Sequence, residues 1–327
     1  MIEKLYYNKK ININESLNLI FNSENVVHKA LLISKINEDM YDAKKINEVR
    51  RYIKKNAKKL KPFKNSLDTC GTGGDGKKTL NISTAVALLL ASMGIKISKH
   101  GNKAASSKSG STDVLQELGV KMYSDEENIH KSLNNDNFVY LNAPNFLPDL
   151  RHVGEARKLL GFKTFFNLIG PTLNPLQANF QIIGAFNEKA AKTIAGLLYI
   201  NKIKNFKVFS SKDGLDEISI FSPTIVFEKS KNKINKKIYN NNNYKKYLTK
   251  KNPSFDQIIG KDAKYNANKI IDMFEGKKDS YRDIVVINSI YGLKTIKPNI
   301  NFEKAYELIN NILDNKVSIN FLHNITK

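Results

Sequence analysis

Apolar residues recur at the three- and four-residue spacing of helices through residues 1–62. The spacing is clearest in Glu15–Ile20 and Val26–Ile36. A basic stretch at residues 54–59, followed by Pro62, ends the pattern, because proline cannot continue a helix. We therefore expect residues 1–62 to form a small N-terminal helical domain.

From Leu67 onwards the pattern changes to short β-branched runs that alternate with glycine-rich loops and helical segments. The runs that predict strands are Ile95–Ile97, Phe138–Tyr140, Gln181–Ile183 and Phe206–Phe209. Helical periodicity returns in Ala263–Phe274, Arg282–Tyr291 and Phe302–Leu313. Alternating strands and helices are typical of an α/β domain, which we expect over residues 63–327. Within it, residues 229–251 are rich in lysine and asparagine, so we expect a solvated insertion or a poorly ordered loop there.

The composition fits a soluble protein of about two domains. The chain has 327 residues and a mean hydropathy of −0.41. No apolar run approaches the roughly 20 residues of a membrane span, and the charged start Met1–Lys4 lacks the apolar core of a signal peptide. We therefore expect a cytoplasmic protein. Cys70 is the only cysteine, which excludes an internal disulfide, and its spacing to the five histidines is not that of structural zinc.

A formal charge of +22 raises the possibility of a nucleic-acid partner, since clustered lysine and arginine bind phosphate chains. Lysine, asparagine and isoleucine are, however, all used heavily, as in the tract Asn240–Asn243. An A+T-rich coding sequence would produce that joint excess without any ligand. No RNA-binding or zinc-finger signature accompanies the charge, so a nucleic-acid-binding protein is kept only as an alternative.

The first candidate site is the glycine-rich stretch Asp68–Gly76, which precedes an apolar helix. Four glycines within six residues allow the backbone to approach a ligand closely. Asn81, Ser83 and Thr84 follow where the helix begins, so free N–H groups and the helix dipole would face the same loop. The stretch predicts a phosphate cradle, although it is neither a Walker A motif nor a dinucleotide fingerprint. The alternative is an ordinary glycine-rich turn before a capped helix.

A second loop, Lys99–Asp113, has the same character: lysines and small hydroxyl residues lead into a helix over Val114–Leu118 that Gly119 stops. Two such loops imply a ligand with two phosphate groups. The alternatives are a solvated turn for the lysines and an ordinary loop position for His100. For Asp113 we expect a helix N-cap.

Two further features bear on chemistry. The adjacent carboxylates Asp216 and Glu217 could hold Mg²⁺, which proteins bind through one or two carboxylates plus substrate phosphates. The alternative is a pair of solvated surface acids. The planar guanidinium of Arg157 could donate two hydrogen bonds to a substrate carboxylate. The alternative is an ordinary arginine on a helix surface.

Taken in order, these motifs resemble those of the anthranilate phosphoribosyltransferase family, and the resemblance runs from the N-terminal helices to about Asn288. The resemblance rests on the segments Gly71–Gly76, Asn81–Thr84, Lys99–Asn102, Ser109–Ser111, Phe166–Pro171 and Leu215–Glu217. The resemblance implies transfer of the phosphoribosyl group of 5-phosphoribosyl 1-diphosphate (PRPP) to the amine of anthranilate in tryptophan biosynthesis. It also implies a small helical domain packed on a larger α/β domain with a central mixed sheet flanked by helices, and a homodimer formed through the helical part.

The resemblance assigns site residues without any covalent nucleophile. The family's PRPP contacts match Gly71, Gly74, Asp75, Thr79, Asn81, Ile82, Ser83, Thr84, Lys99, His100, Gly101, Asn102, Lys103, Ala104, Ala105, Ser106, Ser107 and Ser111. Its anthranilate contacts match Gly71, Asn102 and Arg157. Its ligands for two magnesium ions match Ser83, Asp216 and Glu217.

Some positions depart from the family pattern. The family commonly has arginine where Lys103 and Lys163 stand, and alanine where Thr112 stands. Leu147 stands before Pro148 where the family usually has histidine near the aromatic substrate, and leucine cannot form a hydrogen bond there. A related fold that phosphorolyses pyrimidine nucleosides remains an alternative, although its lysine loop differs from residues 99–113.

Overall fold

The computed structural model describes residues 12–73, 76–103 and 109–326. The described chain begins with three helices, α2 (Ile13–Asn22), α3 (Val26–Asn37) and α4 (Ala43–Lys55). The N-cap residues of these helices are Asn12, Asn25 and Asp42, in that order. In each case the side-chain oxygen of the cap accepts a hydrogen bond from a backbone N–H of the first turn. The helix expected over Val26–Ile36 is therefore confirmed.

Within the described residues the centre of the fold is a seven-stranded sheet of order β3-β2-β1-β4-β5-β6-β7. Its strands are β1 (Leu67–Gly71), β2 (Ile97–Gly101), β3 (Phe138–Asn142), β4 (Phe180–Gly184), β5 (Asn205–Ser211), β6 (Thr224–Ser230) and β7 (Lys233–Tyr239). The first five in chain order pair in parallel, whereas β6 and β7 are antiparallel. The expected mixed sheet is confirmed. In the pairing of β1 with β4, Gly71 lies opposite Gly184.

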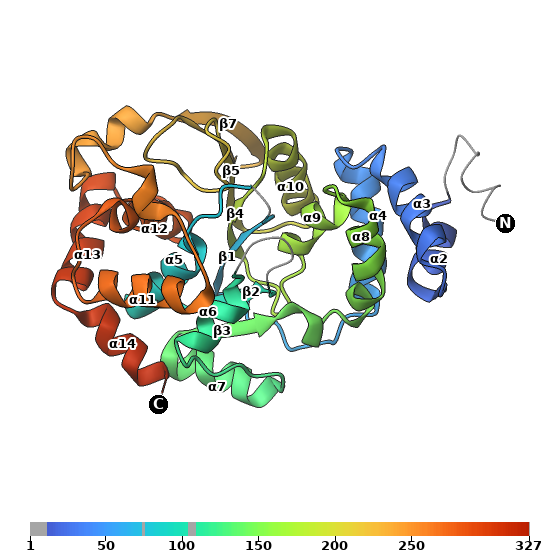
Figure 1. Ribbon diagram of the computed structural model, residues 1–327, viewed down its shortest axis with the longest axis horizontal. Coiled ribbons are helices and arrows are strands. Elements are labelled where there is room, and N and C mark those ends of the chain that lie inside the picture. The colour runs from blue at the N-terminus through green and yellow to red at the C-terminus, as the bar shows by residue number, and fades with distance from the viewer. Residues whose placement is uncertain (1–11, 74–75, 104–108, 327) are drawn as a thin grey trace.

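Helices cover both faces of the sheet (Figure 1). One face packs on α5 (Ile82–Ser92), α6 (Ser111–Glu117), α11 (Ala263–Phe274), α12 (Ser280–Ile296), α13 (Phe302–Asp314) and α14 (Val317–Ile325). The other carries α10 (Glu188–Ile200), α9 (Phe165–Ile169), α8 (Gly154–Leu160) and the N-terminal helices, which share one apolar core. Helix α7 (Glu126–Asp136) packs on β3. The three N-terminal helices thus do not stand apart, because α8 lies against α3.

Short 3₁₀ turns connect these elements. They are η1 (Ala143–Asn145), η2 (Pro148–Val153), η3 (Gly170–Thr172), η4 (Asn241–Tyr247) and η5 (Phe255–Ile258). In the part of the chain that the structure describes, no helix combines the length and apolar character needed to cross a membrane.

The expectation of a poorly ordered loop at residues 229–251 is wrong, although much of the segment is exposed to solvent, as expected. The segment contains the end of β6, the whole of β7 and η4. Strand β7 pairs with β6 along its full length, and Tyr244 of η4 is buried, with its hydroxyl 3.0 Å from that of Tyr291. The lysine side chains of β7 are exposed, as their composition suggests, but a few aromatic anchors fix the backbone.

Candidate active site

Most of the predicted site residues lie where the parallel strands end. Gly71 ends β1, Gly101 ends β2, and Asp216 follows β5. Because the carboxyl ends of parallel strands meet at one side of a sheet, three loops far apart in the sequence come together there. Ligands of open α/β sheets bind in the crevice outside these ends.

The loop after β1 is tied to β4. The N–H of Thr72 donates to the carbonyl of Gly184 at 2.9 Å, and its hydroxyl accepts the N–H of Phe186 at 3.1 Å. Gly73 and Gly76 have φ values of +64° and +76°, which side chains rarely tolerate, so the turn requires glycine there. Gly74 and Asp75 lie outside the described residues.

The helix α5 begins next to this loop. Asn81 is its N-cap but makes no capping bond, since its side chain donates to the Ser109 carbonyl at 3.4 Å and accepts from Asn266 at 2.9 Å. The buried Thr84 hydroxyl has no partner within the described residues. The adjacent Ile82 is buried and the Ser83 side chain is half-buried, so of the two only Ser83 is partly open to a ligand. Thr79 is held by a backbone bridge to Ile259.

Lys99 lies behind this helix start. It points inward from β2, and its Nζ donates to the carbonyl of Thr69 and lies 3.4 Å from the hydroxyl of Ser83. Burial lowers the pKa of Lys99, although attraction by Cys70, Asp68 and Glu217 opposes this. The ammonium group therefore contributes positive charge from behind Ser83, and its side chain is not exposed to the crevice.

His100 is a buried strand residue, so the alternative of an ordinary loop histidine is wrong. Its Nδ1 lies 2.6 Å from Oδ2 of Asp68, and its Nε2 lies 2.9 Å from the carbonyl oxygen of Gly170. Both partners are acceptors, so only the protonated ring satisfies both. Burial alone would lower the pKa of His100, but the Asp68 carboxylate and the two hydrogen bonds outweigh it and hold that pKa above its usual value. Sequence reasoning assigned no role to Asp68, although it is the one charged residue of the short strand β1.

The second loop is anchored by Tyr140. Its hydroxyl lies 2.9 Å from that of Ser111 and 2.7 Å from that of Thr112. A Cβ atom at Gly101 would lie 2.3 Å from the Ser111 hydroxyl, so only glycine allows this approach. The carbonyl of Asn102 accepts the Thr112 N–H at 3.5 Å.

The remaining predicted residues of this loop contribute little to the described site. Asn102 and Lys103 are exposed, while Ala104, Ala105, Ser106 and Ser107 lie outside the described residues. The expectation that Asp113 is an N-cap is wrong: Gly110 is the N-cap, and Asp113 stands three positions later, where its carboxylate accepts the Gly110 N–H at 2.8 Å. This bond from the third helical position stabilises the same end of α6.

The Asp216–Glu217 pair lies directly on the ends of β1 and β4. A Cβ at Gly71 would lie 2.8 Å from Oδ2 of Asp216, and one at Gly184 would lie 1.6 Å from the Asp216 carbonyl oxygen. Glu217 is buried, so the alternative of two solvated surface acids is wrong. Gly184 went unnoticed in the sequence, although its position after an apolar strand was a usable signal.

These residues fit a magnesium ion that arrives with phosphate. Asp216 and Glu217 offer carboxylate oxygens and Ser83 a hydroxyl, the oxygen ligands that Mg²⁺ prefers. Lys99 contacts Ser83 and lies close enough to Glu217 to feel its charge, which brings the two donors into one region. No cluster of three or more histidine, cysteine or acidic residues able to hold a metal occurs in the described ranges. The ion would need further oxygens from substrate and water.

Arg157 lies on the helical side of the crevice, on α8. Its guanidinium lies 5.5 Å from the ring centre of Phe166, and burial lowers its pKa. The next residue of α9, Asn167, donates to the carbonyl of Thr72 at 3.5 Å, which links this helix to the glycine-rich loop. Leu147 is buried in the same apolar core as α8 and offers no polar group.

Comparison with known proteins places this fold and site in a class. A sequence model of the glycosyl transferase family, a/b domain, matches residues 64–316. Anthranilate phosphoribosyltransferase of Pelagibacter ubique is 43% identical over 240 residues, which is 73% of this chain and 72% of that protein. The enzyme of the same name from Clostridium beijerinckii is 39% identical over 77% of this chain and 73% of its own.

Solved structures agree. Anthranilate phosphoribosyltransferase from Thermus thermophilus superimposes with a TM-score of 0.85 at 25% identity, covering 99% of this chain and 98% of that one. The Saccharomyces cerevisiae enzyme in complex with PRPP and Mg shares the fold, with a TM-score of 0.81 at 23% identity over 99% of this chain and 89% of its own. The chain is a glycosyl transferase by its α/β domain. Within that class it belongs to the anthranilate phosphoribosyltransferase family.

Proposed function

We propose that this chain transfers the phosphoribosyl group of PRPP to the amine of anthranilate. The nitrogen of anthranilate forms a bond to C1 of the ribose, the C1–O bond breaks, and its electron pair leaves on pyrophosphate while the nitrogen loses a proton. The observation that carries the proposal is the meeting of the glycine-rich loop, the start of α5 and the Asp216–Glu217 pair at one end of the sheet, in a chain with the relatives described above. Neither nucleoside phosphorolysis nor a purely nucleic-acid-binding role is favoured by those relatives.

The donor would lie against the glycine-rich loop and the two helix starts. The N-termini of α5 and α6 and the hydroxyls of Ser83 and Ser111 offer donors to phosphate oxygens. Lys99 adds charge from behind without contacting solvent. Held in this way, the diphosphate is neutralised by preorganised groups as its charge develops, which lowers the barrier without a covalent nucleophile.

We assign Ser83, Asp216 and Glu217 to bind two magnesium ions together with the diphosphate. Magnesium supplies neutralisation of the departing pyrophosphate when it is bound. The yeast relative was solved with PRPP and Mg, which supports the choice of metal. The chain's own part is to hold the two carboxylates against the glycines at the ends of β1 and β4, so that they are aligned before substrate arrives.

We assign the acceptor to the gap between the sheet and α8. The Arg157 fork would bind the carboxylate of anthranilate, with Gly71 and Asn102 completing the pocket. A yeast relative was solved in complex with 4-fluoroanthranilate, which supports an aromatic acid as the acceptor. Because Leu147 cannot form a hydrogen bond, we expect weaker acceptor binding than a histidine there would give.

The test follows loss of anthranilate fluorescence in a mixture of purified protein, PRPP and Mg²⁺, with a chelator as the control. We expect a chelator-sensitive loss. Glu217→Gln should lower turnover at saturating Mg²⁺ by about a hundredfold or more, as expected for loss of one electrostatic stabiliser. Glu307→Gln, on the exposed face of α13, should leave turnover unchanged. Phosphate-dependent cleavage of uridine, or no turnover together with salt-sensitive DNA binding, would overturn the proposal.

We also propose a homodimer formed through the helical part, working in the cytoplasm in tryptophan biosynthesis. Val27 and Leu31 of α3 and Leu159 of α8 expose apolar side chains, as does Phe162 just beyond α8. Val27, Leu159 and Phe162 are 57%, 62% and 51% exposed, and the two helices pack on each other. Exposed large apolar residues on two neighbouring helices are what a protein interface would cover.

A further inference from the structure

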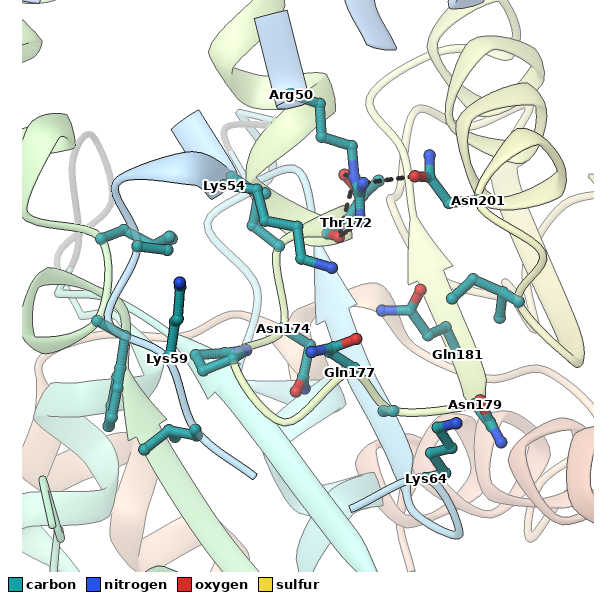
Figure 2. A pocket seen from close by; sticks show the side chains of 18 of the residues that line it. Arg50, Lys54, Lys59, Lys64, Thr172, Asn174, Gln177, Asn179, Gln181 and Asn201 are labelled. Atoms are coloured by element: carbon teal, nitrogen blue, oxygen red, sulfur yellow. Dashed lines mark hydrogen bonds between the residues drawn. The ribbon is translucent and has the colours of Figure 1, made fainter. Parts of the chain in front are cut away.

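A cavity of about 440 Å³ lies near the amino ends of β1, β4 and β5, whereas the candidate active site lies at their carboxyl ends. Figure 2 shows the side chains that line it. It is bounded by the C-terminal half of α4, by residues 57–64 before β1, by Phe146 and Leu147 after β3, by residues 172–181 at the start of β4 and by residues 201–203 before β5. Three of these segments thus lead into β1, β4 and β5, whose other ends carry Gly71, Gly184 and the Asp216–Glu217 pair. None of the residues predicted to bind PRPP, anthranilate or magnesium lines this cavity, although Leu147, discussed above for the acceptor site, does.

The lining is strongly and unevenly charged. Its cationic residues are Arg50, Lys54, Lys58, Lys59, Lys64 and Lys202, whereas no aspartate or glutamate of the described chain lines it. Lys58 donates to the carbonyl of Ser124, and none of the six forms an ion pair with a carboxylate of the described chain. Elsewhere lysines do find such partners, for example Lys207 with Glu228. Many other lysines also lack such a partner, in keeping with the net charge of +22; what distinguishes the cavity is that six cations line it together without an acid of the described chain.

Arg50 shows the imbalance most clearly, because it is buried in the cavity wall. Its Nε and Nη2 donate to Thr172 and its Nη1 donates to the side-chain oxygen of Asn201 at 2.6 Å, so its partners are neutral. Burial lowers the pKa of Arg50 to about 10, and burial together with repulsion from Arg50 lowers that of Lys54. A buried charge without an opposite charge is costly, and a bound anion would remove that cost.

Two other features of the lining indicate which chemical groups the bound anion would carry. Gln181 is buried, and its Oε1 has no donor within the described residues, so it calls for a ligand hydroxyl or N–H. Leu60, Phe146 and Leu173 supply apolar walls. The volume lies within the range of about 300–1,000 Å³ that small-molecule sites occupy. The cavity thus suits a compact molecule that combines several negative charges with hydroxyl groups and an apolar part.

We propose that this cavity is a second ligand site, separate from the candidate active site, that binds a small phosphorylated metabolite with hydroxyl groups, such as a nucleotide. The phosphates contact Lys54, Lys59 and Lys64, the hydroxyl groups donate to Gln181, and the base or sugar packs on the apolar walls. Nucleic acid is disfavoured, because the cations gather around one cavity and do not form a stripe that an extended chain could follow.

The test measures binding of ATP and of inorganic tripolyphosphate by calorimetry, with a chelator present so that metal is absent. The variant Lys54→Gln/Lys64→Gln removes two exposed cavity charges and should fold normally. Lys245→Gln/Lys250→Gln, at two exposed lysines distant in sequence from the cavity and outside any ion pair in the described chain, is the matched control. We expect the cavity variant to bind ATP at least tenfold more weakly than wild type, with tripolyphosphate bound less tightly than ATP throughout. Both double variants should keep wild-type turnover of PRPP.

Three results would overturn the proposal. Equal ATP affinity in wild type and the cavity variant would show that these lysines bind nothing small. An equal loss in the two double variants would show a diffuse effect of net charge. Cavity-dependent binding of a 20-nucleotide single strand without any binding of ATP would assign the lysines to nucleic acid. Because ATP binding is read separately from turnover, failure here leaves the proposed reaction untouched.

Discussion

Arginine is rare in this chain, with 5 residues against 48 lysines, and the positions where it occurs are informative. Arg50 divides its donors between Thr172 and Asn201, and Arg282 donates from one nitrogen to both Asn310 and Asp314. Arg157 stacks on Phe166. Arg50 reaches its partners with three separate nitrogens in one plane, which the single ammonium of lysine cannot do. In a composition dominated by lysine, the few arginines therefore mark places where geometry matters.

The buried pair of His100 and Asp68 predicts a pH dependence of stability. The pKa of His100 is raised and that of Asp68 is lowered, despite the burial of both. The stabilisation from His100 is complete below its unfolded pKa of about 6.5 and is lost as the pH rises through the raised value. The stabilisation from Asp68 is lost as the pH falls through its own lowered value. Asp68→Asn should therefore cost about 3–5 kcal/mol at pH 6 and less at pH 9.

Urea unfolding of wild type and variant between pH 5.5 and 9 measures this difference. Asp256→Asn, at an exposed position, is the control and should change little. If the loss in unfolding free energy caused by Asp68→Asn were independent of pH, the pair would stabilise the fold through packing and hydrogen bonding and not through its charges.

A second prediction at this scale concerns Gly184. Its missing Cβ leaves room for the Asp216 carbonyl, which is backbone and cannot rotate away. Gly184→Ala should destabilise the fold by about 1–3 kcal/mol and displace the carboxylate pair, so that turnover falls even where the protein remains folded. Gly154→Ala, where nothing lies within 4 Å of a new Cβ, should be neutral or slightly stabilising. Thermal unfolding and turnover of both variants test this prediction. Unaltered turnover in Gly184→Ala would contradict the placement of the Asp216–Glu217 pair in the active site.

At the scale of elements, the sequence located some segments better than others. Ala263–Phe274 was predicted with the bounds that α11 has, because its apolar spacing is regular and its surface is polar. Strand β2 begins at Ile97, where the prediction ended, since its later residues, Ser98, Lys99 and His100, are polar and buried through tertiary contacts. Strand β7 was missed because its exposed lysines hide its pairing.

The β5–β6–β7 ladder supplies a prediction through Glu228. This buried carboxylate pairs with Lys207 of β5 and Lys237 of β7 and accepts the Tyr239 hydroxyl at 2.7 Å. Although burial alone would raise the pKa of Glu228, these partners hold it at about 2. Its stabilisation is complete above the unfolded pKa of about 4.5 and is lost as the pH falls towards 2.

Glu228→Gln should cost about 1–3 kcal/mol at pH 7 and progressively less in acid. Glu188→Gln breaks an exposed pair with Lys236 and should cost about 0–1 kcal/mol. Chemical denaturation at pH 7 and pH 3.5 compares the two variants, and equal losses would contradict the role given to Glu228.

At the scale of the molecule, the exposed apolar face of α3 and α8 predicts assembly. Val27→Glu/Leu159→Glu places two charges on that face and should convert a dimer into a monomer with its fold intact. Ile238→Glu, which adds a charge at an exposed apolar position on β7, should leave the dimer in place. Sedimentation velocity distinguishes these states, and a dimer that persists in the double variant would place the interface elsewhere.

The molecule as a whole also shows what a sequence can and cannot reveal about a site. The motifs pointed to loops after β1 and β2 and to Asp216–Glu217, and the structure brings these segments together. The motifs could not show that Lys99 and His100 are buried, with Lys99 behind Ser83 and His100 against Asp68, because neighbouring strand residues lie on opposite faces and only tertiary packing decides what each face contacts. The cavity beside Arg50 was also invisible, since its lining comes from four separate segments.

Strand β7 has one further consequence, for solubility. It is the last strand of the described sheet, so one side of its backbone offers unpaired N–H and carbonyl groups to which a foreign strand could add. Lys233 is exposed along it, and Lys236 and Lys237 stay about half exposed although they pair with Glu188 and Glu228. A strand approaching from another copy would bring these lysines towards their counterparts. The lysine excess that first suggested a nucleic-acid partner thus protects this border of the sheet against aggregation.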